Sequence, residues 1–168
     1  MVVPDADISI RSTTESDLVF VLRVERSTDL VRHATIQEHR DLFVDPHSAH
    51  LLFNVRGQPA GYLILRDVAT PDRSIRLQRI VVATPGQGVG RQILRMLKTL
   101  AFQELRAHRL WLDVMEDNVR ARHLYQSEGF KTEGMFREAC WRRDAFVSLI
   151  IMSILEEEWR HEPRRSPG

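Results

Sequence analysis

The stretch VVATPGQGVGRQILRMLKTLAF, residues 81–102, decides the fold. It begins as an apolar run, turns through Gly86, Gly88 and Gly90, and continues with apolar residues at helical spacing. A strand, a glycine turn and a helix are therefore predicted in that order. Glycine permits positive φ and lets a ligand approach the backbone, and the first N–H groups of a helix have no partner within it. Together with the helix dipole, these groups make a site for an anion.

A phosphate or pyrophosphate is the ligand that such a turn suits best. The spacing of the three glycines, however, excludes two common phosphate-binding loops. The Rossmann pattern G-x-G-x-x-G needs glycine at position 91, where Arg91 stands. The P-loop needs lysine and then serine or threonine directly after Gly88 or Gly90, and the chain has neither there. By itself, the stretch is equally consistent with a glycine turn that holds no ligand.

The flanking sequence predicts a mixed α/β domain. Alternation in ISIRS predicts a first strand, and a helix follows Thr14, which with Asp17 approximates a capping box. Before the glycine turn we expect a helix near 35–43, a hairpin from LLFNV through RGQP to AGYLIL, and a strand at IRLQRIVV. After it we expect strands at RLWLDVM, KTEGMF and AFVSLIIMSIL. The order implies a mostly antiparallel sheet with strand–helix–strand crossovers in its centre.

Composition narrows the class of protein. The 168 residues suit one domain, expected at residues 1–156, with a charged tail at 157–168 that we expect to be disordered. Lys plus Arg total 24 against 23 for Asp plus Glu, which argues against a nucleic-acid binder. No apolar run is long enough to span a bilayer, and MVVPDADISI lacks the positive start of a signal peptide, so no membrane role and a cytoplasmic location are expected.

Metal and disulfide chemistry is not expected. Cys140 is the single cysteine, which excludes an internal disulfide and any zinc site that needs several cysteines. The seven histidines show no H-E-x-x-H spacing, so no metal ligand is assigned.

A second cluster, LDVMEDNVRARHLYQSEGF at residues 112–130, strengthens the case for a ligand at the glycine turn. It predicts a short helix that begins at Asn118 and ends before Gly129. Asn118 and Tyr125 are seven residues apart and so lie near one face of that helix. Taken singly, Asn118 is explained as a helix cap and Tyr125 as a packed aromatic residue.

The two clusters together resemble the GNAT superfamily of acetyl-CoA-dependent N-acetyltransferases. IVVATPGQGVG is similar to its V-x-x-x-x-[RQ]-G-x-G-[IV]-G loop, and residues 118–130 are similar to its N-x-x-A-x-x-x-Y-x-x-x-G-F helix. The opening ISIRSTTESDL also resembles the first strand and helix of the family. The ending EGMFREACWRRDAFVSLIIMSIL resembles the branch that holds ribosomal-protein N-terminal and polyamine acetyltransferases.

The resemblance implies a central, mostly antiparallel twisted sheet of about seven strands flanked by about four helices. It implies acetyl-CoA as co-substrate and direct transfer of acetyl, in a ternary complex, to a primary amine on a small molecule or a protein N-terminus. It also implies a possible homodimer. Tyr125 is the implied catalytic proton donor to the leaving thiolate. The implied cofactor-binding residues are Ile80, Val81, Val82, Gly86, Gln87, Gly88, Val89, Gly90, Arg91, Asn118 and Tyr125.

Two departures from the family pattern leave alternatives open. Pro85 stands where Arg or Gln is usual and has no N–H to donate. SIRLQRI lacks the carboxylate that often serves as general base, so the base is Glu25, Asp113, Glu116 or a water chain. The rival reading is a non-catalytic acyl-CoA-binding sensor or interaction domain. Residues 141–144 have two functional interpretations, as part of the acceptor pocket or as part of a dimer contact. The alternative is an exposed hairpin turn with neither role.

Overall fold

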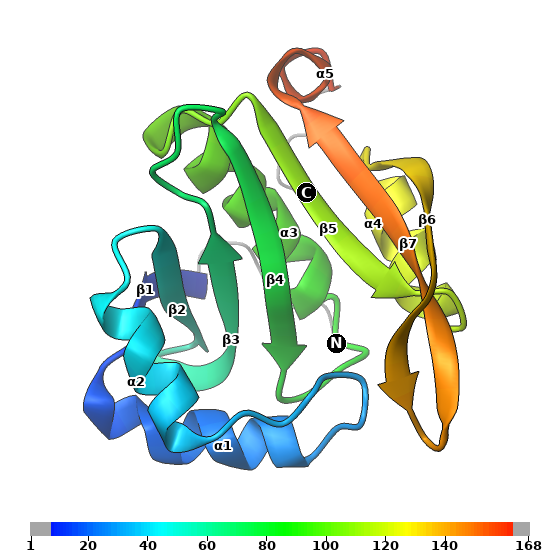
Figure 1. Cartoon of the computed structure of the whole chain (residues 1–168). Helices are drawn as coiled ribbons and strands as arrows, with labels where there is room; N and C mark the ends of the chain where they lie inside the picture. Colours follow the sequence, from blue (N-terminus) through cyan, green and yellow to red (C-terminus); the bar gives the residue numbers. More distant parts are fainter. Residues whose placement is uncertain (1–7, 163–168) are drawn as a thin grey trace.

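The computed structural model describes residues 8–162, in which seven strands form one sheet in the order β1-β2-β3-β4-β5-β7-β6 (Figure 1). Every neighbouring pair is antiparallel except β4 with β5. The expected mixed α/β fold is confirmed. The strands are β1 Ile8–Ser12, β2 Ser48–Val55, β3 Gln58–Arg66, β4 Ser74–Val82, β5 Arg109–Met115, β6 Lys131–Arg142 and β7 Ala145–Leu155.

Helices cover the two faces of the sheet unevenly. The described α-helices are α1 Leu18–Arg26, α2 Ile36–Val44, α3 Val89–Thr99, α4 Val119–Ser127 and α5 Glu156–Arg160. A π-helical turn, Leu100–Glu104, extends α3. Figure 1 shows α1 and α2 on one face, beside β2 to β4, and α3 and α4 on the other face. The first face is left without a helix over β5, β7 and β6.

Local sequence explains where α2 begins and where the short 3₁₀ helix Glu15–Asp17, which leads into α1, begins. Thr14 and Asp17 form the expected capping box, in which the Thr14 N–H donates to Asp17 Oδ2 at 2.8 Å. Thr35 and Glu38 form a second one ahead of α2, and the Thr35 N–H donates to Glu38 Oε2 at 2.7 Å. Both caps satisfy N–H groups that a helix start would otherwise leave without an acceptor.

Each face of the sheet has its own apolar core. Under α1 and α2, the buried side chains include Leu18, Val21, Leu52, Tyr62 and Ile64. The larger core on the other face packs α3 and α4 against the strands. It includes Phe53, Leu63, Leu77, Ile93, Leu97, Leu112, Tyr125 and Met152. Alternation along β3 supplies Leu63 and Leu65 to the larger core and Tyr62 and Ile64 to the other, which fixes the face that each side chain of this strand presents.

The parallel pair β4–β5 is only four residues long. Ser74–Leu77 pair with Arg109–Leu112, and beyond them the two strands diverge in Figure 1. β5 stays paired with β7 along its whole length. From residue 78 to 82, the edge of β4 that is turned towards β5 therefore has no partner strand. We call this divergence the fork. Its open backbone edge is available to an extended ligand, as a sheet edge is to an added strand.

The end of the chain departs from the sequence expectation. A disordered tail was expected from residue 157, but residues 157–162 are ordered, because Trp159 stacks on Phe102 at 5.3 Å between ring centroids and Glu162 lies 2.7 Å from Lys98 Nζ. Residues 163–168 of that expected tail lie outside the described residues. Within residues 8–162, no helix is long and apolar enough to cross a membrane.

Candidate active site

The glycine turn leaves a set of backbone donors exposed at the start of α3. Gly86 and Gly88 have φ values of 99° and 78°, which favour glycine, and Gly88 is the N-cap of α3. Among residues 8–162, no acceptor takes the N–H groups of Gln87, Gly88, Val89 or Gly90. The sequence predicted an anion site at this turn, and these exposed N–H groups with the helix dipole are the donors that such a site would use.

Arg91 contributes less to this site than expected. Its N–H donates to Gly88 O at 3.1 Å, and its guanidinium lies 2.6 Å from the buried carboxylate of Glu128. Glu128 also accepts from Arg95 at 3.0 Å. The Arg91 side chain is therefore engaged with the end of α4.

The second cluster packs directly against the turn. Asn118 Oδ1 accepts from the Ala121 N–H at 3.2 Å, so Asn118 caps α4 as expected. A Cβ placed on Gly90 would lie 3.7 Å from Leu124 and 3.9 Å from Val82. The start of α3, the middle of α4 and the end of β4 therefore meet at one point, where a Cβ on residue 90 would make ordinary van der Waals contacts.

Arg120 is a candidate that sequence reasoning missed. Its Nη2 atom lies 3.7 Å from where a Gly86 Cβ would be, and the described residues offer it no ion-pair partner. The signal was present in the sequence, because Arg120 is two residues after Asn118 on the helix that faces the turn. A guanidinium there supplies the positive charge that Arg91 directs elsewhere.

Tyr125 lies deep in the core on the α4 side of the fork. Only 8% of its surface is exposed, and its ring contacts that of Phe130 at 5.8 Å between centroids. Burial, and then the negative charge of Asp113, raise the pKa of Tyr125 to about 12. The hydroxyl is thus protonated at neutral pH and lies within electrostatic reach of a β5 carboxylate on the other side of the fork.

Asp113 is held at the fork by an arginine of the neighbouring strand. Arg76 Nη2 and Nε donate to Asp113 Oδ1 at 2.5 and 3.1 Å. The same guanidinium lies 5.2 Å from the ring centroid of Trp111. A carboxylate is thereby fixed directly after the last paired residues of β5.

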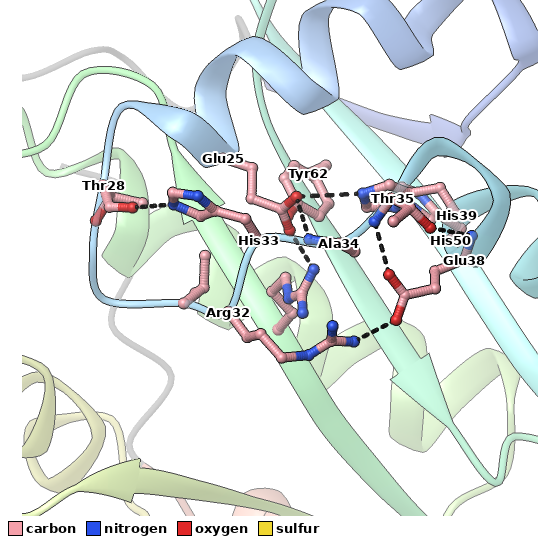
Figure 2. Close-up of polar contacts among 12 residues, drawn as sticks. Glu25, Thr28, Arg32, His33, Ala34, Thr35, Glu38, His39, His50 and Tyr62 are labelled. Carbon is pink, nitrogen blue, oxygen red and sulfur yellow. Dashed lines mark hydrogen bonds and ion pairs between the residues drawn. The ribbon is translucent and has the colours of Figure 1, made fainter. Parts of the chain in front are cut away.

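Glu25 is engaged by four donors and is not placed to act as a base. It accepts from Tyr62 Oη at 2.8 Å and from the Ala34 N–H at 2.9 Å, it contacts Arg79, and its Oε2 lies 3.4 Å from His39 Nε2 (Figure 2). Burial raises its pKa, but the donors outweigh burial and lower the pKa to about 2. Glu25 therefore anchors the loop between α1 and α2.

Two buried histidines continue this network away from the fork. His39 Nδ1 lies 3.0 Å from His50 Nε2 (Figure 2). His50 Nδ1 lies 2.9 Å from Thr13 Oγ1. Burial, with the positive charges of His39 and Arg79, lowers the pKa of His50 to about 4. His50 is therefore neutral at physiological pH and ties β2 to α2.

The other candidates from the sequence lie at the margins of the site. Ile80, Val81 and Val82 all lie on the diverging part of β4, where Val81 packs under α1 and the other two face α3. Glu116 is exposed just beyond the end of β5, and Cys140 is a half-buried free thiol on β6.

A polar cavity of about 470 Å³ opens on the face that carries α2, beside the paired start of β4 and β5. Residues of the α1–α2 loop, α2 and three strands line it, including Arg32, Glu38, Arg66, Arg76, Arg79 and Trp111. The turn of the β6–β7 hairpin meets the same loop, since Arg142 donates to Val31 O at 3.1 Å and Arg143 contacts Asp29. Residues 141–144 thus form a turn that braces the α1–α2 loop.

Comparison with known proteins agrees with this geometry. Residues 16–130 match the family described as "Acetyltransferase (GNAT) family". The chain is 22% identical to spermidine N(1)-acetyltransferase of Escherichia coli K12, over 96% of this chain and 92% of that protein. It is 27% identical to the putative ribosomal N-acetyltransferase YdaF of Bacillus subtilis, over 81% and 75% respectively.

Solved structures share the fold. A spermidine N-acetyltransferase from Vibrio cholerae in complex with CoA and spermine superposes with a TM-score of 0.82, at 21% identity, over 92% of this chain and 99% of that one. A chimera of the spermidine N-acetyltransferase SpeG from Vibrio cholerae and hSSAT gives a TM-score of 0.84 at 21% identity, over 92% of this chain and 99% of that one.

Proposed function

The chain belongs to the acetyltransferase (GNAT) family, an acetyl-CoA-dependent N-acetyltransferase as the motifs predicted, and we propose that its reaction takes place at the fork between β4 and β5. The observation that carries the proposal is the open edge of β4 at the fork, whose end at Val82 lies beside Gly90 and the free N–H groups at the start of α3. The buried Tyr125 supports the proposal, because the charge of Asp113, directly after the paired part of β5, acts on its hydroxyl.

The diphosphate of the cofactor binds at the glycine turn in this proposal. The N–H groups of residues 87–90 donate to its oxygens, and Arg120 adds a positive charge. Arg91 borders the site through its backbone, and Asn118 holds the start of α4 beside it. Pro85 removes one donor, and the remaining amides compensate for that loss. The pantetheine arm then runs along residues 80–82 and brings the thioester to the fork.

Transfer is direct. A lysine-type amine has a pKa of about 10.4 and must lose a proton before it attacks the thioester carbonyl. As the new C–N bond forms, the C–S bond breaks and the CoA sulfur leaves as a thiolate. Tyr125 donates a hydrogen bond and then its proton to that sulfur, and solvent restores the proton. Because Cys140 lies on β6 and the described residues show no path from it to the fork, an acetyl-cysteine intermediate is not part of the proposal.

Asp113 is the carboxylate that faces the incoming amine in this proposal. Its negative charge acts on Tyr125 at the fork, whereas Glu25 has its oxygens occupied and Glu116 lies exposed beyond the strand. The amine proton passes to Asp113 or, through it, to water.

The acceptor is a primary amine on a small molecule or a protein N-terminus. The named relatives act on spermidine or, putatively, on a ribosomal substrate, which fits this range. We also propose a single catalytic domain in the cytoplasm and a homodimer. The exposed apolar side chains of the β6–β7 hairpin, such as Phe136, Trp141 and Phe146, support a paired state.

Release of free thiol from acetyl-CoA across a panel of primary amines tests the proposal. Amine-dependent thiol release that Tyr125→Phe reduces is the expected result. CoA binding without turnover on any amine would instead indicate the acyl-CoA-binding sensor, and no CoA binding would contradict both.

A further inference from the structure

We infer that the acceptor cavity takes an amine that also carries an anionic group, a carboxylate or a phosphate, in preference to a polyamine; this rests on the proposed function. The cavity is the one beside α2, lined in part by Arg32, Arg66, Arg76 and Arg79. A polycation would bind best among carboxylates, whereas the charged residues that line this cavity are mostly arginines.

The cavity borders the proposed reaction centre. Two of its lining residues, Arg76 and Trp111, are register partners in the paired part of β4 and β5, one position before the last pair of Leu77 with Leu112. Arg76 then reaches forward to Asp113 at the fork, 2.5 Å away. An acceptor with its nitrogen at Asp113 would therefore extend its other end into the cavity.

Positive charge dominates the cavity walls. Four arginines line the cavity against two carboxylates, Glu38 and Asp67. Three guanidiniums are open to solvent, with side-chain exposures of 65% for Arg32, 36% for Arg66 and 35% for Arg76. The side chain of Arg79 is 8% exposed and forms an ion pair with the buried carboxylate of Glu25.

Arginines already occupy the carboxylate of Glu38 in the cavity wall and that of Asp113 at the fork, whereas Asp67 forms no ion pair with the four lining arginines. Glu38 accepts from Arg32 at 2.6 Å and from the Thr35 N–H (Figure 2), and Asp113 accepts from Arg76. A polyamine could place one ammonium group at Asp67, but it would have to break an existing pair for each further ammonium group that it brought in. An anion costs no such loss, because each guanidinium has more N–H donors than its present contact uses.

Arg32 and Arg66 are the residues placed to bind the anion. Arg32 makes its contact to Glu38 through a single Nη2 atom, and Arg66 reaches Asp45 and Ser48 through Nη1 at 3.1 and 2.6 Å. Both side chains therefore keep donors for a carboxylate or phosphate. They come from two different elements that line the cavity, Arg32 from the α1–α2 loop and Arg66 from the end of β3.

Steady-state kinetics with acceptors of one chain length tests the inference. δ-Aminovalerate and cadaverine share a five-carbon chain, but one ends in a carboxylate and the other in a second ammonium, and the corresponding aminophosphonate separates phosphate from carboxylate recognition. We expect kcat/KM for δ-aminovalerate or the aminophosphonate to exceed that for cadaverine by about tenfold or more. Arg32→Gln and Arg66→Gln should each reduce that ratio severalfold, whereas Arg160→Gln on α5 removes an equal charge and should leave it unchanged.

Equal or better turnover of cadaverine would overturn the inference, as would a ratio that survives both substitutions. If none of the amines is acetylated, the proposed function fails. The charge preference is then decided separately, by calorimetric titration of the CoA-bound protein with δ-aminovalerate and with cadaverine. Tighter binding of δ-aminovalerate supports the preference, and equal or weaker binding contradicts it.

Discussion

Arg76 and Asp113 form an ion pair 2.5 Å long across the point where β4 and β5 separate. The pair joins two strands that are parallel for only four residues, and it holds a carboxylate beside the opening. Asp113 also acts electrostatically on Tyr125 from the other side of the sheet. One arginine thus fixes the acidic group nearest to the proposed site of acetyl transfer.

Asp113→Asn tests whether this carboxylate faces the acceptor. We expect KM for the amine to rise by about tenfold while KM for acetyl-CoA changes little, because the amide no longer attracts an ammonium or accepts its proton. Steady-state kinetics with each substrate varied in turn measures both constants. A matched change in Glu116, Glu116→Gln, removes a carboxylate just beyond the strand end and should leave both constants near their original values. Unchanged kinetics in Asp113→Asn would remove Asp113 from the reaction.

Tyr125→Phe separates proton donation from cofactor binding. The substitution keeps the buried ring and its contact with Phe130 but removes the hydroxyl. We expect kcat to fall by roughly tenfold or more with little change in the dissociation constant of acetyl-CoA. Rapid-quench kinetics and fluorescence titration measure the two quantities. An unaltered kcat would show that the leaving thiolate takes its proton elsewhere.

Arg120→Gln tests the cation that the structure adds to the glycine turn. We expect CoA to bind severalfold more weakly, and the loss to shrink at high salt, because an exposed guanidinium acts on a phosphate mainly through screened charge. Acetyl-pantetheine lacks the diphosphate, so its reaction should be unaffected by the substitution. Arg26→Gln, on α1, is the matched control. Equal losses for CoA and acetyl-pantetheine would place Arg120 outside the diphosphate site.

Sequence alone predicted the parts of the site that depend on local pattern. The glycine turn before α3, the Asn118 cap and the position of Tyr125 on α4 follow from spacing within a single segment, because backbone conformation there is decided by neighbouring residues. The strands were likewise predicted from alternation and β-branched composition.

The fork and the Glu25 network could not be predicted in this way. Arg76 and Asp113 are 37 residues apart, and Glu25 and Arg79 are 54 residues apart, so their pairing depends on the register of β3, β4 and β5. The ordered tail was missed for a similar reason. Residues 157–162 have little apolar pattern, and they are held by contacts with distant residues, the stack of Trp159 on Phe102 and the ion pair of Glu162 with Lys98.

Glu25→Gln distinguishes an anchor from a base. Removing the carboxylate leaves the buried Arg79 guanidinium without its partner, which we expect to lower the free energy of unfolding by about 3 kcal/mol or more. Urea denaturation measures that change. The pH profile of kcat in protein that remains folded should keep its shape, since Glu25 exchanges no proton with substrate. The anchor role would be contradicted by a variant that stays folded but whose pH profile of kcat no longer shows the titration of an acidic group.

The lowered pKa values predict a specific form of acid instability. His50 has a folded-state pKa of about 4, below the ordinary value of 6.5, so the unfolded chain takes up its proton first and stability is lost as pH falls from about 6.5 towards 4. Glu25, with a pKa of about 2 against 4.5, extends the loss from about pH 5 towards 2. Urea unfolding at a series of pH values should show both parts. In His50→Gln, which cannot be protonated, the slope between pH 6.5 and 5 should flatten while the steeper loss below pH 5 stays. If the upper slope is unchanged in that variant, another group is responsible for it.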